Sequence, residues 1–428
     1  MKIINIDSLA YGGYGVGRID SKVIFVSHAC PGDTLKIDIY DERKRYAFGR
    51  IIEIINPGTE RIAPVCKYFG ICGGCNYLNI SYEEELLWKT EIFQTEFKKI
   101  FKNIINIEDI KLIHDFKGGN CLKYRRKIGL KIFPPFIGFY QKSSHYVVDT
   151  EYCYLAKESL NEMLKNMRGL LLSDNYKNTL LNRTTKITLT DAGVKNITLD
   201  LNNGMKNYDE VSRDIMNKTG ADNIFFESPD KKIARHKESS RNYFILKDKK
   251  FAYALPSFIQ VNEEQNENII NIITGYIKNI GINFKNVLDL YCGYGNITLF
   301  LAAYAKTVTG IEANSFSIKL GEKNLKLNNI KNINFIMSDV VTFIEKADKK
   351  MARYDLIVLD PPKAGIKGLV PKIAKLNPAF VIYVSCDTVT LLRDLKAFVK
   401  MGYTLEQINL IDMFPRTYHM EHIAFLSK

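Results

Sequence analysis

Hydrophobic and polar positions alternate with a period of two along the first 57 residues of the chain. Runs such as "KVIFVSHA" and "TLKIDIYDE" are rich in β-branched and aromatic residues, and turns such as "YGGYGVGR" and "CPGD" separate them. This alternation, bounded by glycine and proline, is typical of short β-strands. Several short strands in so small a segment predict an OB-fold β-barrel.

The spacing of apolar positions changes twice after this segment. Residues 81–104 ("SYEEELLWKTEIFQTEFKKIFKNI") place apolar side chains at helical intervals, which predicts a long amphipathic helix. Residues 123–245 alternate apparent strands with charged turns and contain one helical stretch near 157–170. From residue 246 onward, strands and helices alternate, as they do in a parallel sheet covered by helices on both faces.

These changes of pattern divide the chain into three expected parts. Residues 1–57 form the barrel, and residues 58–245 form a central α+β domain. Residues 246–428 form an α/β, Rossmann-like domain. We expect the helix at 81–104 to pack on this third part.

The totals for the whole chain exclude two classes of protein. Of the 428 residues, 46% are hydrophobic and 25% are charged, which is ordinary for a globular protein. No run reaches the ~18 apolar residues that a membrane-spanning helix needs. The start, "MKIINIDSLAYGG", has no basic region followed by an apolar run, so we expect no secretory signal. We therefore expect a cytoplasmic protein with reduced thiols and no membrane partner.

The positive charge of the chain is compatible with nucleic-acid binding. The formal net charge is +13, although a bias toward lysine along the whole chain weakens this argument. Residues 43–50 ("RKRYAFGR") and 123–142 mix cations with aromatic rings. Such mixtures combine phosphate contact with base stacking. Amphipathic hairpins with basic outer faces are the alternative interpretation.

A glycine-rich loop and a series of carboxylates predict a nucleotide site in the third part. The segment 288–296 ("LDLYCGYGN") is a strand that runs into a tight glycine turn. Glu312, Asp339 and Asp360 each end one of the following strands, and Asp289 precedes the turn. Carboxylates around this crevice repel a pyrophosphate but suit the cationic sulfonium of S-adenosylmethionine. We therefore favour this methyl donor over a dinucleotide.

A cysteine at the end of a later strand is a candidate nucleophile. Cys386 in "YVSCDTVTLLRDL" follows an apolar strand, and Asp387 and Thr388 can cap the next helix. The helix dipole is expected to stabilise a thiolate there. A small buried hydrophobic residue is the alternative interpretation of this cysteine.

A thiolate beside a methyl donor indicates methylation of a pyrimidine carbon. The reaction needs a base that removes the proton from the methylated carbon, and Glu421 in "HMEHIAFL" is the candidate. His419 and His422 compete for this role, and we expect His422 to be a polar surface residue. Lys363 follows "DPP", where enzymes that methylate amino groups typically have an aromatic residue, which argues against such an enzyme.

Three cysteines follow the barrel in the spacing C-x5-C-x2-C. Cys66, Cys72 and Cys75 lie in "PVCKYFGICGGC". In a reducing compartment, clustered cysteines indicate a metal site rather than disulfides. The spacing does not distinguish zinc from an iron–sulfur cluster.

These motifs together resemble the S-adenosylmethionine-dependent (uracil-5-)-methyltransferases of 23S rRNA, which have an amino-terminal TRAM domain. The resemblance covers nearly the whole chain. It rests on the following segments: "LAYGGYGVGR", "VIFVSHACPGD", "PVCKYFGICGGC", "FIQVN", "DLYCGYGN", "LDPPKAG", "YVSCDTVTLLRDL" and "HMEHIAFL".

The resemblance implies roles for particular residues. It implies that Cys386 is the nucleophile and Glu421 the general base. Asp339 stands where some members have asparagine, which puts its contact in doubt. The donor-binding residues implied are Gln260, Tyr291, Asn296, Glu312, Asp339 and Asp360. The family holds a [4Fe–4S] cluster on four cysteines, here Cys66, Cys72, Cys75 and Cys153.

The resemblance also implies the partner and leaves alternatives. We expect a monomer that binds RNA and not DNA, with a 23S rRNA uridine flipped out of a loop. Residues 156–245 depart most from the family, which leaves the choice of target open. One alternative is the same reaction on the T-loop uridine of tRNA. Two others are a non-catalytic iron–sulfur RNA-binding protein and a redox iron–sulfur protein.

Overall fold

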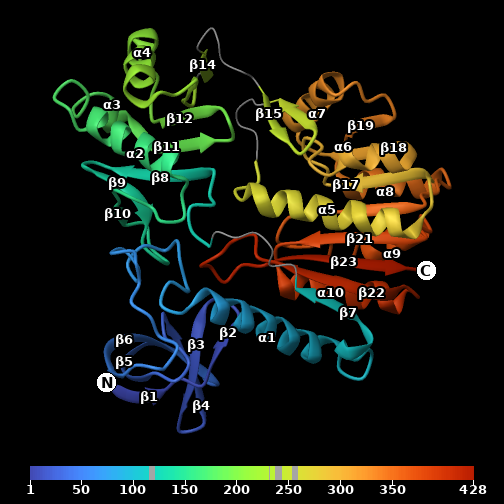
Figure 1. Cartoon of the computed structure of the whole chain (residues 1–428), viewed down its shortest axis with the longest axis horizontal. Helices are drawn as coiled ribbons and strands as arrows, with labels where there is room; N and C mark the ends of the chain where they lie inside the picture. Colours follow the sequence, from blue (N-terminus) through green and yellow to red (C-terminus); the bar gives the residue numbers. More distant parts are fainter. Residues whose placement is uncertain (115–120, 231, 237–242, 253–258) are drawn as a thin grey trace. The chain divides into compact units, whose positions relative to one another are not determined.

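The computed structural model describes residues 1–114, 121–230, 232–236, 243–252 and 259–428 (Figure 1). Their contacts group the chain into two units. The first unit comprises Met1–Trp88, Gly119–Arg241 and Pro415–Tyr418, and the second comprises Lys89–Gly118, Asn242–Phe414 and His419–Lys428. The helix at 81–104 was expected to pack on the third part, whereas the short segment Pro415–Tyr418 departs from the expected boundaries. Most of the predicted helix joins the second unit, and a short piece near the carboxyl end joins the first.

The amino-terminal strands form a curled six-stranded sheet in the order β1-β5-β6-β4-β3-β2. Only two residues separate β1 from β2, and these two strands occupy opposite ends of that order, so the sheet curves around on itself. Its inward side chains, among them Ile24, Val26, Leu35 and Ile37, form a separate apolar core. The strands are β1 (Lys2–Asn5), β2 (Ser8–Ala10), β3 (Tyr14–Ile19), β4 (Lys22–Ser27), β5 (Thr34–Glu42) and β6 (Tyr46–Asn56).

A buried ion pair joins this sheet to the segment that follows it. The Arg61 guanidinium donates to both carboxylate oxygens of Asp33, at 2.8 and 2.5 Å, and also to the His28 carbonyl at 3.0 Å. The Asp33 carboxylate also accepts the backbone N–H groups of Cys30 and Gly58. Because four hydrogen bonds satisfy the buried carboxylate, the segment after β6 is held against the curled sheet.

The rest of the first unit is a seven-stranded sheet in the order β10-β9-β8-β11-β12-β13-β14. All neighbours are antiparallel except β12 and β13, which the helix α4 connects as a parallel pair. The strands are β8 (Lys127–Phe133), β9 (Phe136–Tyr140), β10 (Val147–Asp149), β11 (Thr184–Asp191), β12 (Lys195–Leu201), β13 (Asn223–Glu227) and β14 (Lys232–His236).

Helices cover one face of this sheet. In α2 (Glu158–Leu171), the side chains of Leu160, Met163, Leu164 and Met167 recur at helical spacing and are fully buried. The sequence pattern indicated only this helix. The structure adds the short α3 (Leu180–Arg183), whose two leucines are buried, and α4 (Tyr208–Thr219), in which polar residues separate the buried positions.

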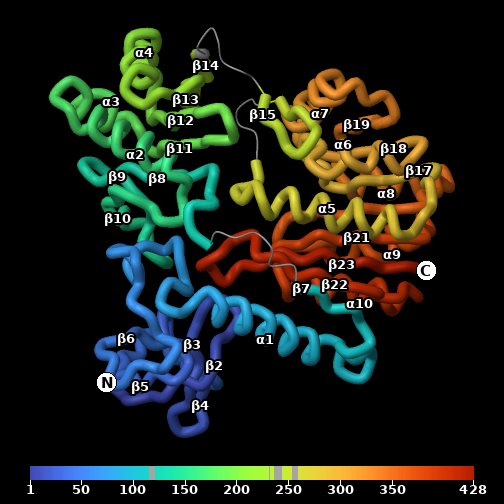
Figure 2. Tube along the Cα trace, in the orientation of Figure 1, coloured from blue at the N-terminus to red at the C-terminus, as the bar shows by residue number. Residues whose placement is uncertain are grey.

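The second unit is built on an eight-stranded sheet in the order β19-β18-β17-β20-β21-β23-β22-β7. Neighbouring strands are parallel except for β23, which runs antiparallel to both β21 and β22. Figure 2 shows β7 beside β22 at one edge. The strands are β7 (Lys111–His114), β17 (Phe284–Leu290), β18 (Ala305–Glu312), β19 (Ile333–Met337), β20 (Leu356–Leu359), β21 (Phe380–Ser385), β22 (Thr404–Ile411) and β23 (Glu421–Ser427).

Helices lie on both faces of this sheet, as the alternating pattern predicted. One face shares an apolar core with α1, α8, α9 and α10, and Tyr276 of α5 packs on Phe425 of β23 at 4.0 Å between ring centroids. A small hairpin, β15 (Tyr243–Leu246) and β16 (Lys249–Ala252), precedes α5, and 3-10 turns lie at Ile107–Asp109 and Ala302–Tyr304. The helices are α1 (Tyr82–Phe101), α5 (Glu263–Ile280), α6 (Thr298–Leu301), α7 (Ser315–Leu327), α8 (Val340–Lys349), α9 (Val370–Lys375) and α10 (Thr388–Lys400).

The helix α1 joins this core through three aromatic residues. Phe93, Phe97 and Phe101 recur every four residues and are buried among residues of α10 and the sheet. Lys89 adds a buried ion pair to Asp412, at 2.7 Å, just beyond the end of β22. This packing explains why most of α1 belongs with the second unit, as the amphipathic pattern had indicated.

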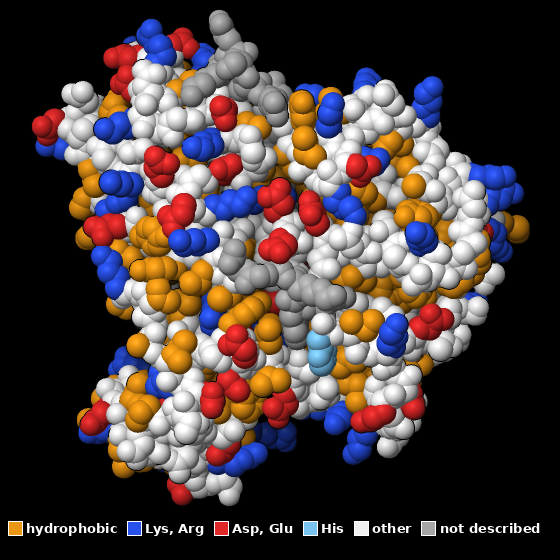
Figure 3. Space-filling view, in the orientation of Figure 1, with side chains coloured by type: hydrophobic (Ala, Val, Ile, Leu, Met, Phe, Trp, Pro, Cys, Tyr) orange, Lys and Arg blue, Asp and Glu red, His pale blue; other side chains and the backbone are white. Residues whose placement is uncertain are grey.

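The surface carries charges of both signs. On the face shown in Figure 3, Lys and Arg side chains lie among Asp and Glu side chains and do not gather in a single patch. The net charge therefore does not by itself locate a binding surface on this face. Within the described ranges, no helix is both long enough and apolar enough to cross a membrane.

Candidate functional site: a carboxylate-lined sheet edge with a thiol

The glycine turn after β17 contains three left-handed residues. Tyr291, Gly293 and Gly295 have φ angles of 63°, 55° and 94°. A Cβ atom at Gly295 would lie 2.5 Å from Leu299, so only glycine fits there. Tyr291 adopts the same backbone region despite its side chain, and such strain is concentrated at functional sites.

Glu312 at the end of β18 is held beside this turn. Its carboxylate accepts the backbone N–H of Gly293 at 3.2 Å and that of Asn314 at 2.7 Å. On the other side of the turn, the amides of Asn296 and Asn266 exchange two hydrogen bonds of 2.8 and 3.0 Å. The sequence pattern did not single out Asn266, because a polar residue within a helix carries no local signal.

Three further residues that were expected to bind the donor lie on the turns and helix starts of the second unit. Asp339 caps α8 by accepting the Thr342 backbone N–H at 3.1 Å, which leaves its second carboxylate oxygen outside this bond. Burial raises the pKa of Tyr291, and the charges of Asp339 and Asp394 add to this effect. Gln260 is partly buried and precedes the α5 cap, Asn262, by two residues.

Two carboxyl groups lie at the centre of the edge, the buried Asp289 and the partly exposed Asp360. Asp289 is 1% exposed and accepts the Thr298 hydroxyl. The pKa of Asp289 is raised to about 7, first by burial and then by the charges of Asp360 and Glu312. The hydrogen bond from Thr298 acts in the opposite direction. Burial likewise raises the pKa of Asp360 to about 7. A positive charge nearby would stabilise the carboxylate forms of Asp289 and Asp360.

The reversed strand β23 brings Cys386 and Glu421 together. The β21–β23 ladder ends with the pair Ser385 and His422; Cys386 directly follows β21, and Glu421 is the first residue of β23. Both residues therefore lie at the same end of this ladder, and the Glu421 charge acts on the Cys386 thiol. Burial raises the pKa of Glu421 well above its ordinary value, and the Asp360 charge adds to this.

The protonation state of Cys386 differs from the sequence-based expectation. Asp387 does cap α10, since its carboxylate accepts the Thr390 backbone N–H at 3.0 Å. The pKa of the Cys386 thiol is nevertheless raised to about 11, first by burial and then by the charges of Glu421, Asp360 and Asp387. The expected stabilisation of a thiolate by the helix dipole is therefore outweighed by burial and three carboxyl groups.

The loop after β20 is anchored to α10. A carboxylate oxygen of Asp394 accepts the Ile366 backbone N–H at 2.8 Å and the Tyr383 hydroxyl at 2.9 Å. The Thr390 hydroxyl donates to the Lys363 carbonyl at 3.0 Å. Gly365 has a φ of 67°, and a Cβ atom there would meet the Asp394 carboxylate at 2.4 Å. These contacts hold the segment after Asp360 in place.

His422 is not the surface residue that the sequence pattern predicted. Its side chain is 0% exposed, and its ring lies 5.4 Å from that of Phe93. The prediction was wrong because β23 lies inside the sheet, between β21 and β22, and α1 covers this face. His419 is partly buried, with its ring 5.9 Å from Phe414.

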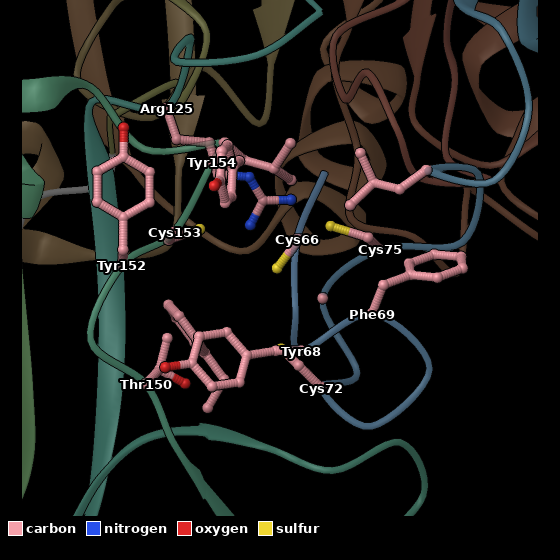
Figure 4. Close-up of a pocket in the computed structure, with 14 residues that line it drawn as sticks. Cys66, Tyr68, Phe69, Cys72, Cys75, Arg125, Thr150, Tyr152, Cys153 and Tyr154 are labelled. Atoms are coloured by element: carbon pink, nitrogen blue, oxygen red, sulfur yellow. The ribbon is translucent and has the colours of Figure 1, made fainter. Parts of the chain in front are cut away.

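A second candidate site lies in the first unit, where four cysteines line one cavity. Cys66, Cys72, Cys75 and Cys153 are among its lining residues, together with Arg125. Figure 4 shows Arg125 with the four cysteines around this cavity, and Cys75 and Cys153 interact with its guanidinium electrostatically. The eight cysteines of the chain form no disulfide in this structure. Burial raises the pKa of Cys72 to about 11.

The cavity is built by segments that are distant in sequence. The loop carrying the first three cysteines is joined to β9 by a bridge between Cys72 and Gln141 and by a Gly73 N–H bond to the Tyr140 carbonyl at 3.0 Å. The Asn161 side chain of α2 accepts the Cys153 backbone N–H at 2.9 Å. In the part of the chain that the structure describes, no three potential ligand side chains are close enough to hold one metal ion.

Comparison with known proteins gives consistent relatives over the whole length. The chain is 30% identical over 442 aligned residues to an "uncharacterized RNA methyltransferase" of Aquifex aeolicus, covering 99% of this chain and 97% of that one. It is 26% identical to a 23S rRNA (uracil(1939)-C(5))-methyltransferase RlmD of Aliivibrio salmonicida, covering 99% and 96% of the two chains.

A solved structure has the same fold. The tRNA (uracil-54, C5)-methyltransferase of Pyrococcus abyssi, in complex with S-adenosyl-L-homocysteine, superposes with a TM-score of 0.73 at 20% identity. The alignment covers 99% of this chain and 100% of that one. Profiles of two families match: TRAM over residues 3–52 and tRNA (uracil-5-)-methyltransferase over residues 124–428. The chain therefore belongs to the tRNA (uracil-5-)-methyltransferase family, whose members are RNA-modifying enzymes, and carries a TRAM domain at its amino-terminal end.

Proposed function

We propose that the protein methylates carbon 5 of a uridine in RNA through covalent addition of Cys386 to carbon 6 of the base. The observation that carries this proposal is that Cys386 and Glu421 lie at the same end of the β21–β23 ladder, where the charges of Glu421 and Asp360 both act on the thiol. A thiol and a buried carboxyl group from different strands then meet at one edge of the sheet. Methylation at a pyrimidine carbon needs such a pair, because it requires a nucleophile and a base.

The steps assign one bond change to each residue. Addition of the Cys386 thiolate to carbon 6 forms an enolate, which makes carbon 5 nucleophilic. When bound, S-adenosylmethionine supplies the electrophilic methyl group. Glu421, as a carboxylate, takes the proton from carbon 5, the double bond re-forms, and the Cys386 thiolate leaves carbon 6. The raised pKa of Glu421 makes its carboxylate a stronger base for this step.

The residues at the carboxyl ends of the strands fit a cationic donor. Glu312 is already held beside the glycine turn by two backbone N–H groups and is placed to accept ribose hydroxyls. Burial raises the pKa of Asp289 and Asp360, and the positive charge of a sulfonium nearby would stabilise their carboxylate forms. The residues proposed to bind the donor remain Gln260, Tyr291, Asn296, Glu312, Asp339 and Asp360.

The outer face of the amino-terminal sheet supports RNA binding. Five aromatic rings form a contiguous group there, with neighbouring ring centroids 5.4 to 6.4 Å apart. The Lys142 ammonium lies 4.2 Å from the Tyr14 ring centroid. Exposed rings beside a cation provide stacking surfaces for unpaired bases. The rings are those of Tyr14, Phe25, Tyr40, Tyr46 and Phe48.

We propose 23S rRNA as the target, and the T-loop uridine of tRNA is the alternative. The support for rRNA is the full-length similarity to RlmD proteins, at 26–28% identity. Possession of the TRAM domain does not discriminate between the targets, because the Pyrococcus tRNA enzyme matches this chain over its whole length. The choice of 23S rRNA as the target therefore rests on sequence similarity to RlmD proteins and not on the domain composition of the chain.

Methylation of unmodified transcripts tests both the reaction and the target. The full-length protein is incubated with labelled S-adenosylmethionine and either 23S rRNA or tRNA made by transcription. Nuclease fragments are then analysed by mass spectrometry. We expect 5-methyluridine in 23S rRNA only. Label in tRNA alone would replace the proposed target, and label in neither RNA would contradict the proposed activity.

We also propose that Cys66, Cys72, Cys75 and Cys153 hold a [4Fe–4S] cluster. The four thiols line one cavity, which fits a group that takes four cysteine ligands. Four cysteine thiols could also hold zinc, so the metal content of the protein distinguishes the two groups. A cluster at this place would join the loop after the barrel to the segment that precedes α2.

Replacement of one cluster cysteine is expected to remove the iron. The Cys75→Ser variant, prepared without oxygen, should lose most of its iron and the visible absorption of an iron–sulfur cluster, because one thiolate ligand is missing. Iron and acid-labile sulfide are measured per chain. Cys121→Ser is the matched control, since Cys121 does not line the cavity and a serine oxygen can still accept from Arg416. Equal iron in both variants, or zinc alone in the wild type, would contradict the proposal.

A further inference from the structure

A buried imidazole lies directly behind the turn that carries Cys386. The Nδ1 atom of His422 lies 3.0 Å from the Ser385 carbonyl oxygen, and its Nε2 atom lies 3.2 Å from the Thr388 hydroxyl. Ser385 is the last residue of β21, and Thr388 is the first residue of α10. One side chain therefore contacts both ends of the two-residue turn formed by Cys386 and Asp387.

The partners determine the tautomer of this imidazole. A carbonyl oxygen only accepts hydrogen bonds, so the Nδ1 atom of His422 carries the proton. The Nε2 atom then accepts from the Thr388 hydroxyl. Burial lowers the pKa of His422 to about 4, against the raising effects of its bond to Ser385 and of the Asp387 charge. The ring is thus neutral at physiological pH, and its low pKa makes it a weak base whose two nitrogens are already held by Ser385 and Thr388.

We infer that His422 is a positioning residue that fixes the Cys386–Asp387 turn between strand and helix. The inference rests on the proposed function, in which this turn presents the Cys386 thiol to carbon 6 of the base. The two hydrogen bonds join the strand to the helix across the turn. The Phe93 ring, 5.4 Å away, packs against the imidazole and limits its rotation.

An apolar side chain of similar size could fill the same space but could not form these bonds. The Thr388 hydroxyl is fully enclosed, since Thr388 is 3% exposed, and a buried hydroxyl without a partner is costly. Loss of the imidazole would therefore loosen the start of α10 and the turn before it. A shift of about 1 Å in a reacting group can lower the rate about 10²-fold.

Three replacements of His422 distinguish a role in positioning the turn from a role in filling space in the apolar core. His422→Leu removes both bonds, whereas His422→Asn places an amide N–H near the Nδ1 position and His422→Gln places an amide oxygen near the Nε2 position. The matched control is Phe97→Leu, because Phe97 is buried in the same core without contacting the turn. Each full-length variant is measured for thermal unfolding, for kcat and KM with RNA, and for the rate at which iodoacetamide alkylates Cys386, located by mass spectrometry.

We expect two effects of opposite sign in His422→Leu. The kcat value should fall about 10²-fold with little change in KM, while alkylation of Cys386 accelerates because a loosened turn exposes the thiol to water. His422→Asn and His422→Gln should each recover part of kcat. If His422→Leu folds poorly, the same comparison is made with these two variants. Equal losses of kcat in Phe97→Leu and the His422 variants, or unchanged alkylation, would overturn the inference.

The alkylation measurement keeps this inference separate from the proposed mechanism. If Cys386→Ala methylates RNA normally, the mechanism fails. The reactivity of the Cys386 thiol in the His422 variants still reports whether the imidazole fixes the turn.

Discussion

The Cys386→Ala variant is expected to form no detectable 5-methyluridine and no covalent complex with RNA. Without the thiolate, carbon 6 of the base receives no nucleophile and carbon 5 stays too electron-poor to accept a methyl group. Loss of a covalent nucleophile typically costs at least about 10⁴-fold in rate. The measurement is incorporation of labelled methyl into RNA, together with a denaturing gel that detects RNA bound to protein.

A second cysteine variant shows whether this loss is specific. Cys30 is fully buried in the curled amino-terminal sheet, so Cys30→Ala should keep most of the activity. In the wild type, labelling of Cys386 by iodoacetamide should accelerate as pH rises, because burial and nearby carboxyl groups raise its pKa to about 11. Normal methylation by Cys386→Ala would show that the reaction does not pass through this thiol.

The Glu421→Gln variant is expected to stop after methyl transfer, with its RNA still attached to Cys386. The glutamine amide cannot remove the proton from carbon 5, so the double bond does not re-form and the thiol does not leave. Turnover should fall at least about 10²-fold, which is the usual contribution of a general base. A denaturing gel should show a labelled protein–RNA band that accumulates with time.

An exposed glutamate provides the matched control for this variant. Glu345 forms a surface ion pair with Lys372, so Glu345→Gln should turn over normally and leave no trapped band. If Glu421→Gln turns over without a trapped band, the proton is removed by another group, and His419 is then the residue to replace. His422 is a poor candidate because it is buried, its lowered pKa makes it a weak base, and both ring nitrogens are hydrogen-bonded.

Many features of the second unit were predictable because their signals are local. The glycine turn, the strand ends at Glu312, Asp339 and Asp360, and the capping of α10 by Asp387 follow from short segments. The carboxyl ends of parallel strands share one edge, so the sequence order of these residues already predicts that they lie near one another. The amphipathic spacing of Phe93, Phe97 and Phe101 likewise indicated a buried helix face.

Other features depended on pairings between distant segments. The reversed direction of β23 cannot be read from its own residues, yet it places Glu421 at the same edge as Cys386. The short piece Pro415–Tyr418 joins the first unit, where Arg416 donates to the Tyr77 and Ile80 carbonyls and pairs with Glu85. No local pattern distinguishes these side chains from ordinary surface charges.

The helix α4 shows the limit of pattern reading in the central region. Tyr208, Val211 and Ile215 recur at helical spacing and are buried, and Gly220 ends the helix in a left-handed conformation. The many polar residues between them concealed this signal among charged turns. Packing of the narrow apolar stripe against α2 and the sheet supplies the stabilisation that intrinsic helix preference does not.

The sequence by itself determined the types of chemistry that this protein carries: a thiol after a strand, carboxylates at successive strand ends and a cluster of cysteines. Only the tertiary structure decided the protonation states of these groups. Burial and neighbouring charges raise the pKa of Cys386 and Glu421 and keep His422 neutral. Because a pKa depends on the distance to water and to charges from other segments, it is defined only when the strands have paired and the helices have covered the sheet.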